Sequence, residues 1–252
     1  MSRALAAAVI TTGCALMVGC GDGSAAPPMS ITVFAAASLN GTFTELGDAF
    51  AAAHPGATVR FSFGPSSGLA AAIVAGAPAD VFAAAGDPPM GAVLDAGEAS
   101  TSTHFATNSM MIALPPANPG HIDSLADLAD PNVKVSRCQV AVPCGAAATQ
   151  VLQAAALTVT PVSEDVDVKG VLTRVTLGEV DAGLVYVTDV RAAGDKVIGI
   201  PIPSAVNATT SYPIAALTRA ANPELAQQFV DFVRSAEGQR VLRAAGFQPP
   251  TQ

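Results

Sequence analysis

The chain has 252 residues, of which 50% are apolar and 13% are charged, and its formal net charge is −8. This length allows one large domain or two lobes of ordinary size, and the apolar share excludes a disordered chain. No run of Lys or Arg occurs, which argues against a nucleic-acid partner, because phosphate contacts need clustered basic side chains.

The N-terminal segment has the pattern of an export signal. Arg3 precedes an apolar stretch over residues 4–18, which is too short to be a stable membrane span. The sequence LMVGC at residues 16–20 resembles the cleavage box of bacterial lipoproteins, in which the Cys becomes the lipidated first residue. We therefore predict a lipoprotein signal peptide at residues 1–19 and lipidation of Cys20. A soluble secreted protein with a spare cysteine is the alternative.

The residues that follow Cys20 are rich in Gly, Ala and Pro, and residues 20–29 are predicted to be a flexible tether. The mature protein would then be exported and anchored by its lipid to the outer face of the cell membrane.

From Ser30 onward, short apolar runs alternate with helical patterns, which is typical of an α/β domain. In the first part of the chain, strands are predicted at residues 31–35, 59–63 and 81–84. Helices are predicted at residues 39–53, between the turn 64–68 and Gly76, and around Met90.

The second part of the chain continues this alternation. Strands are predicted at residues 109–114, 182–187, 197–201 and 212–217, with one or two strand pieces between residues 133 and 142. Helices are predicted at residues 123–128, 145–156, 168–177, 225–234 and 238–245.

Two cysteines, Cys138 and Cys144, lie in the part of the chain that should fold. Because the exported compartment is oxidising, we expect a disulfide between them. A zinc site is the alternative, but it lacks ligands, since His54, His104 and His121 are scattered without metal-site spacing.

Ser38 and Ser66 each stand where a predicted strand gives way to a helix. A helix start presents unpaired N–H groups and a partial positive charge, so it attracts anions, and a serine hydroxyl there adds a donor. Both serines can equally be simple N-caps, which Ser favours in any protein.

Two further helix starts lie in the middle of the chain, at VPCG (residues 142–145) and DVKG (residues 167–170). Four helix starts from two parts of the sequence would suit an anion that is held between two lobes.

One motif points to a different class of protein. The sequence GPSSG at residues 64–68 matches G-x-S-x-G, the nucleophile elbow of serine hydrolases. That fold needs a histidine late in the chain, and the last histidine is His121, so the order of the triad cannot be met. We therefore expect no enzymatic activity.

Several segments resemble one known family, the periplasmic molybdate-binding proteins of bacterial ABC importers. The segments that carry the resemblance are VFAAASL (33–39), GAPADVF (76–82), VPCG (142–145), DVKG (167–170), DAGLVY (181–186) and AAGF (244–247). They extend over nearly all of the mature chain.

The resemblance implies a two-lobed type 2 periplasmic binding protein fold, which is an α/β architecture with the ligand cleft between the lobes. Residues 30–107 and 211–252 would form the first lobe and residues 108–210 the second, with the chain crossing twice between them. The implied function is to capture molybdate, and tungstate as an analogue, and to deliver it to the membrane permease subunit of an ABC importer. We expect a monomer with no cofactor and with no protein ligand to the metal atom itself.

The ligand-binding residues of the family fall on Ser38, Ser66, Cys144, Val168 and Tyr186 of this sequence. The resemblance implies hydroxyl donors at the two serines and the tyrosine, and backbone N–H donors at the other two positions. Pro65 replaces a hydroxyl residue that is usual in the serine turn of the family, so Ser67 is a further candidate.

None of these donors is a carboxylate, which suits an anion that is fully deprotonated at neutral pH, such as molybdate. A phosphate site would be expected to include an acidic side chain that accepts the proton of the anion. The absence of a carboxylate donor distinguishes molybdate poorly from sulfate and does not distinguish it from tungstate. A binding protein for an organic solute is the remaining alternative, and it would need an Arg or Asp in the cleft.

Overall fold

The computed structural model describes residues 29–250. The predicted signal peptide, Cys20 and the tether up to residue 28 lie outside the described residues. Within residues 29–250, no helix combines the length and the apolarity that are needed to cross a membrane.

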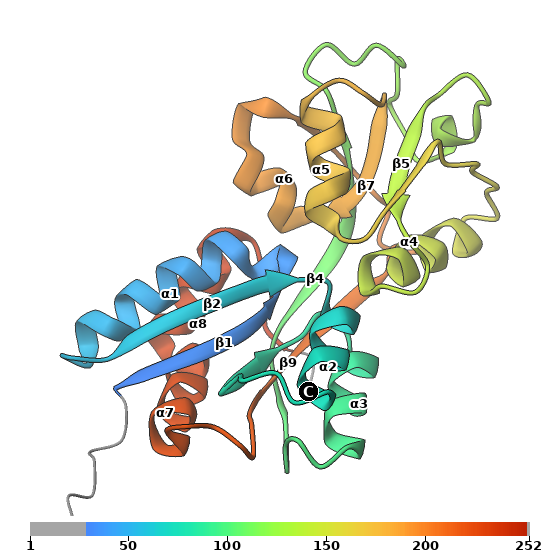
Figure 1. The fold of residues 1–252 in the computed structure, drawn as a ribbon. Helices are drawn as coiled ribbons and strands as arrows, with labels where there is room; N and C mark the ends of the chain where they lie inside the picture. Colours follow the sequence, from blue (N-terminus) through green and yellow to red (C-terminus); the bar gives the residue numbers. More distant parts are fainter. Residues whose placement is uncertain (1–28, 251–252) are drawn as a thin grey trace, which may run out of the picture.

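Two lobes are joined by two long strands, β4 (Thr103–Leu114) and β9 (Thr209–Ala216), as Figure 1 shows. The strands of the first lobe are β1 (Ser30–Ala36), β2 (Thr58–Gly64) and β3 (Val81–Ala83). Its helices are the 3-10 turn η1 (Ala37–Leu39), α1 (Asn40–Ala53), α2 (Ser66–Val74), α3 (Asp87–Asp95), α7 (Pro223–Arg234) and α8 (Ala236–Ala245).

The second lobe lies between the two linking strands in sequence. Its strands are β5 (Val135–Cys138), β6 (Ser163–Asp165), β7 (Ala182–Tyr186) and β8 (Ile198–Pro201). Its helices are α4 (Pro143–Ala154), α5 (Val168–Thr176) and α6 (Val187–Ala193), with the 3-10 turns η2 (Ala126–Ala129) and η3 (Gly194–Lys196).

The nine strands of residues 29–250 form one sheet with the order β2-β1-β3-β9-β4-β7-β5-β6, and β8 pairs with β4 off this path. β1 is parallel to β2 and β3 in the first lobe, and β5 is parallel to β6 and β7 in the second. The linking strands β4 and β9 are antiparallel to each other. Parallel neighbours end at the same edge, so each lobe has one edge at which its parallel strands end.

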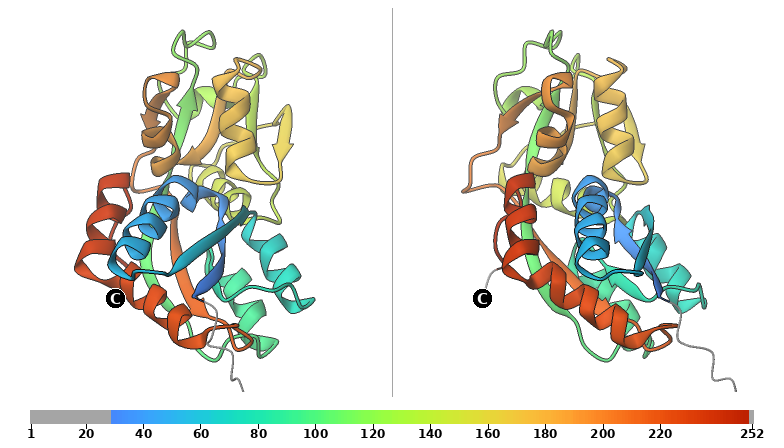
Figure 2. Two further views of the ribbon diagram at one scale, coloured as in Figure 1. Left: turned by 60° about the vertical axis from the view of Figure 1, so that its left-hand side comes forward. Right: turned by 90° about the vertical axis from the view of Figure 1, so that its left-hand side faces the viewer.

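Each lobe has its own apolar core. In the first lobe, α1, α7 and α8 pack on one face of the sheet, and α2 and α3 pack on the other, as the two views of Figure 2 allow the reader to follow. Val81 and Ala83 of β3 face the first group and Phe82 faces the second, as the period-two alternation of a strand requires. Buried side chains between Met110 and Ala208 form the core of the second lobe. The predicted lobe boundaries at residues 107/108 and 210/211 fall inside β4 and β9, and they stay a prediction.

Four helices begin earlier than the sequence analysis predicted: α2, α4, α7 (at Pro223 instead of residue 225) and α8 (at Ala236 instead of residue 238). α2 begins at Ser66, inside the predicted turn 64–68, because Pro65 has an extended backbone and the helix starts directly after it. α4 begins at Pro143 instead of residue 145, because a proline is tolerated in the first helical turn, where its missing N–H has no partner in any case.

The linking strands are also longer than predicted. β4 begins at Thr103 and β9 at Thr209, and residues 106–109 of β4 pair with residues 209–212 of β9. The first parts of both strands carry Thr, Ser, Asn and His side chains and so lack the apolar run on which the prediction depended. β6 and α6 were not predicted; β6 has the sequence Ser-Glu-Asp and gives no apolar signal.

Candidate functional site

The five predicted donors lie at or after the carboxyl end of a strand. Ser38 follows β1 and Ser66 follows β2 in the first lobe. In the second lobe, Cys144 comes after β5, Val168 comes after β6, and Tyr186 is the last residue of β7. Ligands of open α/β sheets bind outside the carboxyl ends of parallel strands. The order of strands and helices therefore brings donors from both lobes to one place.

These five residues line one small cavity between the lobes. All of them are buried, with exposed fractions between 1% for Tyr186 and 7% for Ser38. The cavity has a volume of about 20 Å³. Pockets for organic solutes have volumes of roughly 300–1,000 Å³, so this cavity is far smaller than those pockets.

The two predicted backbone donors lie in the first turns of helices, where N–H groups have no partner within the helix. Cys144 is the second residue of α4, and Val168 is the first residue of α5. Asp167 also lines the cavity, and its carboxylate accepts the N–H groups of Lys169 at 2.9 Å and Gly170 at 3.0 Å. The carboxylate thus caps α5 and leaves the N–H of Val168 available to a ligand.

Two of the predicted hydroxyl donors receive a hydrogen bond at their own oxygen. The N–H of Ala85 donates to Ser66 Oγ at 3.0 Å. The hydroxyl of Thr210 donates to Tyr186 Oη at 3.4 Å. Because these bonds occupy an acceptor position on each oxygen, the hydroxyl hydrogens remain for a ligand in the cavity.

Ser38 is hydrogen-bonded to Tyr212, which sequence reasoning placed in a strand and did not include in the site. Ser38 Oγ lies 2.9 Å from Tyr212 Oη. Thr210 and Tyr212 lie two residues apart on β9 and therefore share one face of the strand. Two features of the sequence could have pointed to Tyr212: the alternation along this strand, and the fact that the chain has just two tyrosines.

An ion pair with a buried carboxylate connects α5 to the start of α6. Lys169 Nζ lies 2.8 Å from Asp189 Oδ1, and the Asp189 side chain is fully buried. The other carboxylate oxygen of Asp189 accepts the N–H of Tyr186 at 3.2 Å. Burial raises the pKa of Asp189, and the Lys169 ammonium opposes that rise. The pair links α5, which begins at Val168, to the start of α6 beside Tyr186.

Burial also raises the pKa of Tyr186 and Tyr212 well above the ordinary value of 10.0. The negative charge of Asp189 acts in the same direction on both. At neutral pH both tyrosines are therefore neutral hydroxyls that can donate.

The predicted disulfide between Cys138 and Cys144 is present. It joins the end of β5 to the first turn of α4, where the predicted N–H donor lies. The loop is so tight that a Cβ at Gly145 would lie 1.9 Å from the carbonyl oxygen of Gln139. The disulfide and this glycine together hold the start of α4 against the end of β5.

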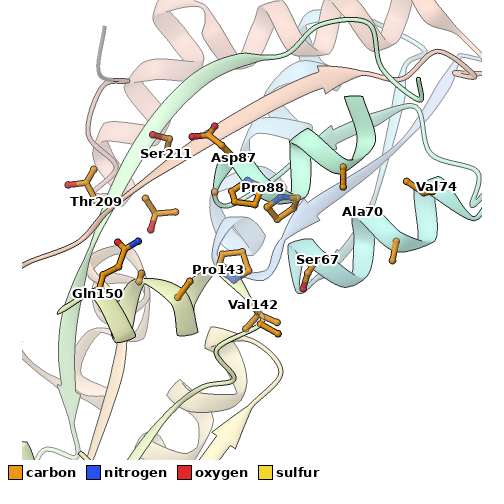
Figure 3. Close-up of a pocket in the computed structure, with 18 residues that line it drawn as sticks. Ser67, Ala70, Val74, Asp87, Pro88, Val142, Pro143, Gln150, Thr209 and Ser211 are labelled. Atoms are coloured by element: carbon orange, nitrogen blue, oxygen red, sulfur yellow. The ribbon is translucent and has the colours of Figure 1, made fainter. Parts of the chain in front are cut away.

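A larger cavity of about 680 Å³ lies beside the small one, also between the lobes. Figure 3 shows its walls, which include Ala70 and Val74 of α2, Pro88 of α3, Gln150 of α4, and Thr209 and Ser211 of β9. Ser67 lines this cavity and not the small one, so the structure separates the two neighbouring serines. The carboxylate of this cavity, Asp87, is paired with His104 Nε2 at 2.6 Å.

Neither cavity contains the groups of a hydrolase. Among residues 29–250, no histidine lines either cavity, and Ser66 Oγ is bonded to the backbone N–H of Ala85. Within the same part of the chain, no group of three or more His, Cys, Asp or Glu side chains could hold a metal ion.

Known proteins resemble the chain over most of its length. The family described as bacterial extracellular solute-binding protein matches residues 31–248. Molybdate-binding protein ModA of Mycobacterium tuberculosis is 42% identical over 259 aligned residues, which cover 99% of this chain and 98% of that protein.

Two solved structures share the fold. The periplasmic molybdate-binding protein of Azotobacter vinelandii has a TM-score of 0.78 at 23% identity and covers 88% of this chain and 100% of its own. The sulfate-binding protein SubI of Mycobacterium tuberculosis has a TM-score of 0.74 at 20% identity. The match covers 87% of this chain and 86% of SubI. Both likenesses show the α/β architecture of periplasmic binding proteins, and the architecture alone does not distinguish their ligands.

Proposed function

Because the chain belongs to the family of bacterial extracellular solute-binding proteins, we propose that it captures molybdate and delivers it to an ABC importer. Membership of this family makes it a binding protein and not an enzyme. One observation supports molybdate as the ligand: the small cavity between the lobes is lined by hydroxyl and N–H donors. The 42% sequence identity to a molybdate-binding protein, which extends over nearly the whole chain, supports the same ligand.

The proposed donors are the hydroxyls of Ser38, Ser66 and Tyr186 and the backbone N–H groups of Cys144 and Val168. They carry no formal charge, yet they can hold a dianion, because hydrogen bonds to an ionised group are about twice as strong as neutral ones. The starts of α2, α4 and α5 add partial positive charge at the same place.

The donor set favours an anion that needs no acceptor. Molybdate and tungstate have the same charge and nearly the same size, so we propose that the site binds both. Sulfate is smaller and would leave some of the donors at longer distances. Phosphate carries a proton at neutral pH, and none of the five proposed donors is a carboxylate that would accept it. Asp167, the carboxylate that lines the cavity, uses Oδ1 for both of its bonds to the first turn of α5.

An organic solute fits the small cavity poorly because of its volume of about 20 Å³. The larger cavity has sufficient volume, but its carboxylate, Asp87, is engaged by His104. The anion site therefore remains the better candidate.

We also propose that the protein acts at the outer face of the cell membrane, held by a lipid on Cys20. The lipoprotein-type cleavage box at residues 16–20 supports this location, as does the extracellular family. The permease subunit of the importer would be its partner, and a monomer would suffice for this role.

Calorimetric titration of the protein without its signal peptide should test the proposal. Molybdate and tungstate should bind with similar high affinity, and sulfate and phosphate should bind more weakly. The chain has two tyrosines and no tryptophan, so tyrosine fluorescence provides a second readout from within the site. Tighter binding of sulfate than of molybdate would contradict the proposed ligand.

A further inference from the structure

Tyr212 contacts donors from both lobes, although it lines neither cavity. Its side chain is fully buried on β9. Its hydroxyl oxygen lies 2.9 Å from Ser38 Oγ, and its ring meets the ring of Tyr186 edge-on, with the centroids 6.2 Å apart. Tyr212 can therefore act on a bound anion only through these neighbours.

The proposed role of Ser38 sets the direction of its hydrogen bond with Tyr212. Under the proposed function, Ser38 donates its single hydrogen to the anion. The 2.9 Å contact between Ser38 Oγ and Tyr212 Oη then requires that the Tyr212 O–H donates to Ser38.

This direction decides what Ser38 can offer to a ligand. A free serine hydroxyl can donate a hydrogen bond or accept one. Here the oxygen of Ser38 receives the O–H of Tyr212, and the hydrogen of Ser38 is left for the cavity.

We infer that Tyr212 is a positioning residue, whose hydroxyl directs the Ser38 hydrogen to the bound anion and prevents Ser38 from accepting a proton that the anion carries. Tyr212 thereby contributes to the preference for fully deprotonated anions over protonated ones. The inference rests on the proposed function, since it concerns the same site. Tyr212 lies on β9, which is one of the two strands that link the lobes.

A double-mutant cycle tests whether Tyr212 acts through Ser38. Tyr212→Phe keeps the ring, which packs edge-on against Phe105 and Phe247, and removes only the hydroxyl. By calorimetry, it should weaken molybdate binding by up to about tenfold, because it removes a hydrogen bond between two neutral hydroxyls and none to the ligand itself. In the Ser38→Ala background the same substitution should have no further effect, because the hydroxyl that it orients is gone.

Selectivity and a matched control complete the experiment. Tyr212→Phe should weaken molybdate and sulfate binding more than the binding of inorganic phosphate in mildly acidic buffer, where phosphate carries protons. Thr107→Val removes a different buried hydroxyl, on β4, which donates to the carbonyl of Pro249 at 3.1 Å and has no bond to the site. This control should bind as the parent does, and circular dichroism should show the native fold in every variant.

Three results would overturn the inference. They are unchanged molybdate affinity in Tyr212→Phe, an equal loss with and without the Ser38 hydroxyl, and an equal loss for molybdate and phosphate. If the parent protein prefers another dianion, the proposed ligand is wrong. The double-mutant cycle measured with that dianion then decides the role of Tyr212. If the parent binds no dianion, both the proposed function and the role of Tyr212 fall.

Discussion

Ser66 and Ser67 are adjacent in sequence, yet they line different cavities. Both lie in the first turn of α2, and successive residues of a helix point about 100° apart. Ser66 is almost completely buried, and its oxygen accepts the N–H of Ala85, whereas Ser67 faces the larger cavity. The early start of α2 after Pro65 therefore selects which of the two serines lines the small cavity.

Ser66→Ala should weaken molybdate binding by roughly tenfold to a hundredfold, because one hydrogen bond to a charged ligand is worth about 1.5–3 kcal/mol. Ser67→Ala is the matched control and should leave the affinity unchanged. Calorimetry on the two variants measures the difference. A larger loss in Ser67→Ala than in Ser66→Ala would show that the other serine is the donor.

At the scale of elements, the start of α4 depends on the disulfide and on Gly145. Cys138 closes the loop from β5, and the N–H of Cys144 is a proposed donor at the cavity. Both restraints act on the same few residues, so each contributes to the stability of the fold and to the position of one donor.

Replacing Cys138 and Cys144 by serine should lower the free energy of unfolding by about 2 kcal/mol, since the closed loop is short and its constraint on the unfolded chain is modest. It should also weaken molybdate binding, because the start of α4 is no longer tied to β5. Urea unfolding and calorimetry measure the two effects. Stability and affinity equal to those of the parent would mean that the bridge restrains neither.

Gly145→Ala should disrupt the site, because the added Cβ would lie within 1.9 Å of the Gln139 carbonyl oxygen and the loop would have to move. Gly41→Ala on α1 is the control. Nothing lies within 4 Å of a Cβ at that position. There, alanine should stabilise the helix by up to about 1 kcal/mol. Melting temperatures and molybdate titrations distinguish the two variants, and normal binding by Gly145→Ala would contradict the tight loop.

At the scale of the whole molecule, the two lobes meet at the site and are connected by β4 and β9. The proposed donors come from both lobes, so a bound anion bridges them. Each lobe has its own core, which allows the lobes to move as separate bodies about the linking strands.

Molybdate should therefore close the cleft. Small-angle X-ray scattering should show a smaller radius of gyration with molybdate than without it, because the anion satisfies donors that otherwise face each other across the cleft. Phosphate at the same concentration serves as the control for ionic strength. A radius of gyration that does not change would argue against closure and would leave the site itself untouched.

Alkaline pH should unfold the protein through its two tyrosines. Their pKa values are raised above 10.0 in the fold, so the folded state keeps protons that the unfolded state has lost. Their contribution to stability is thus complete below pH 10.0 and falls as the pH rises towards the folded-state values, by about 1.4 kcal/mol per pH unit for each tyrosine.

Tyrosinate absorbance should accordingly appear together with the loss of the circular dichroism signal. Because the chain contains only these two tyrosines, the absorbance reports on Tyr186 and Tyr212 alone. Tyr212→Phe should reduce the steepness of the alkaline transition. Ionisation at an ordinary pH in a protein that keeps its native spectrum would contradict the burial of these hydroxyls.

By itself, the sequence determined the α/β class, most strands and helices and the disulfide, because apolar periodicity and cysteine placement are local signals. The resemblance of short motifs placed the five candidate donors, and the structure brings them to one cavity. The donors follow strand ends and helix starts, which are readable in the chain.

Only the tertiary structure decided which groups orient these donors. Tyr212 meets Ser38 from a position 174 residues away, and Ala85 meets Ser66 through a backbone N–H that no side-chain pattern reveals. It also decided that Ser67 faces another cavity. The polar first parts of β4 and β9 were not predicted for the same physical reason. They are strands because β4 and β9 pair with each other, and such pairing between distant segments produces no apolar periodicity in either segment.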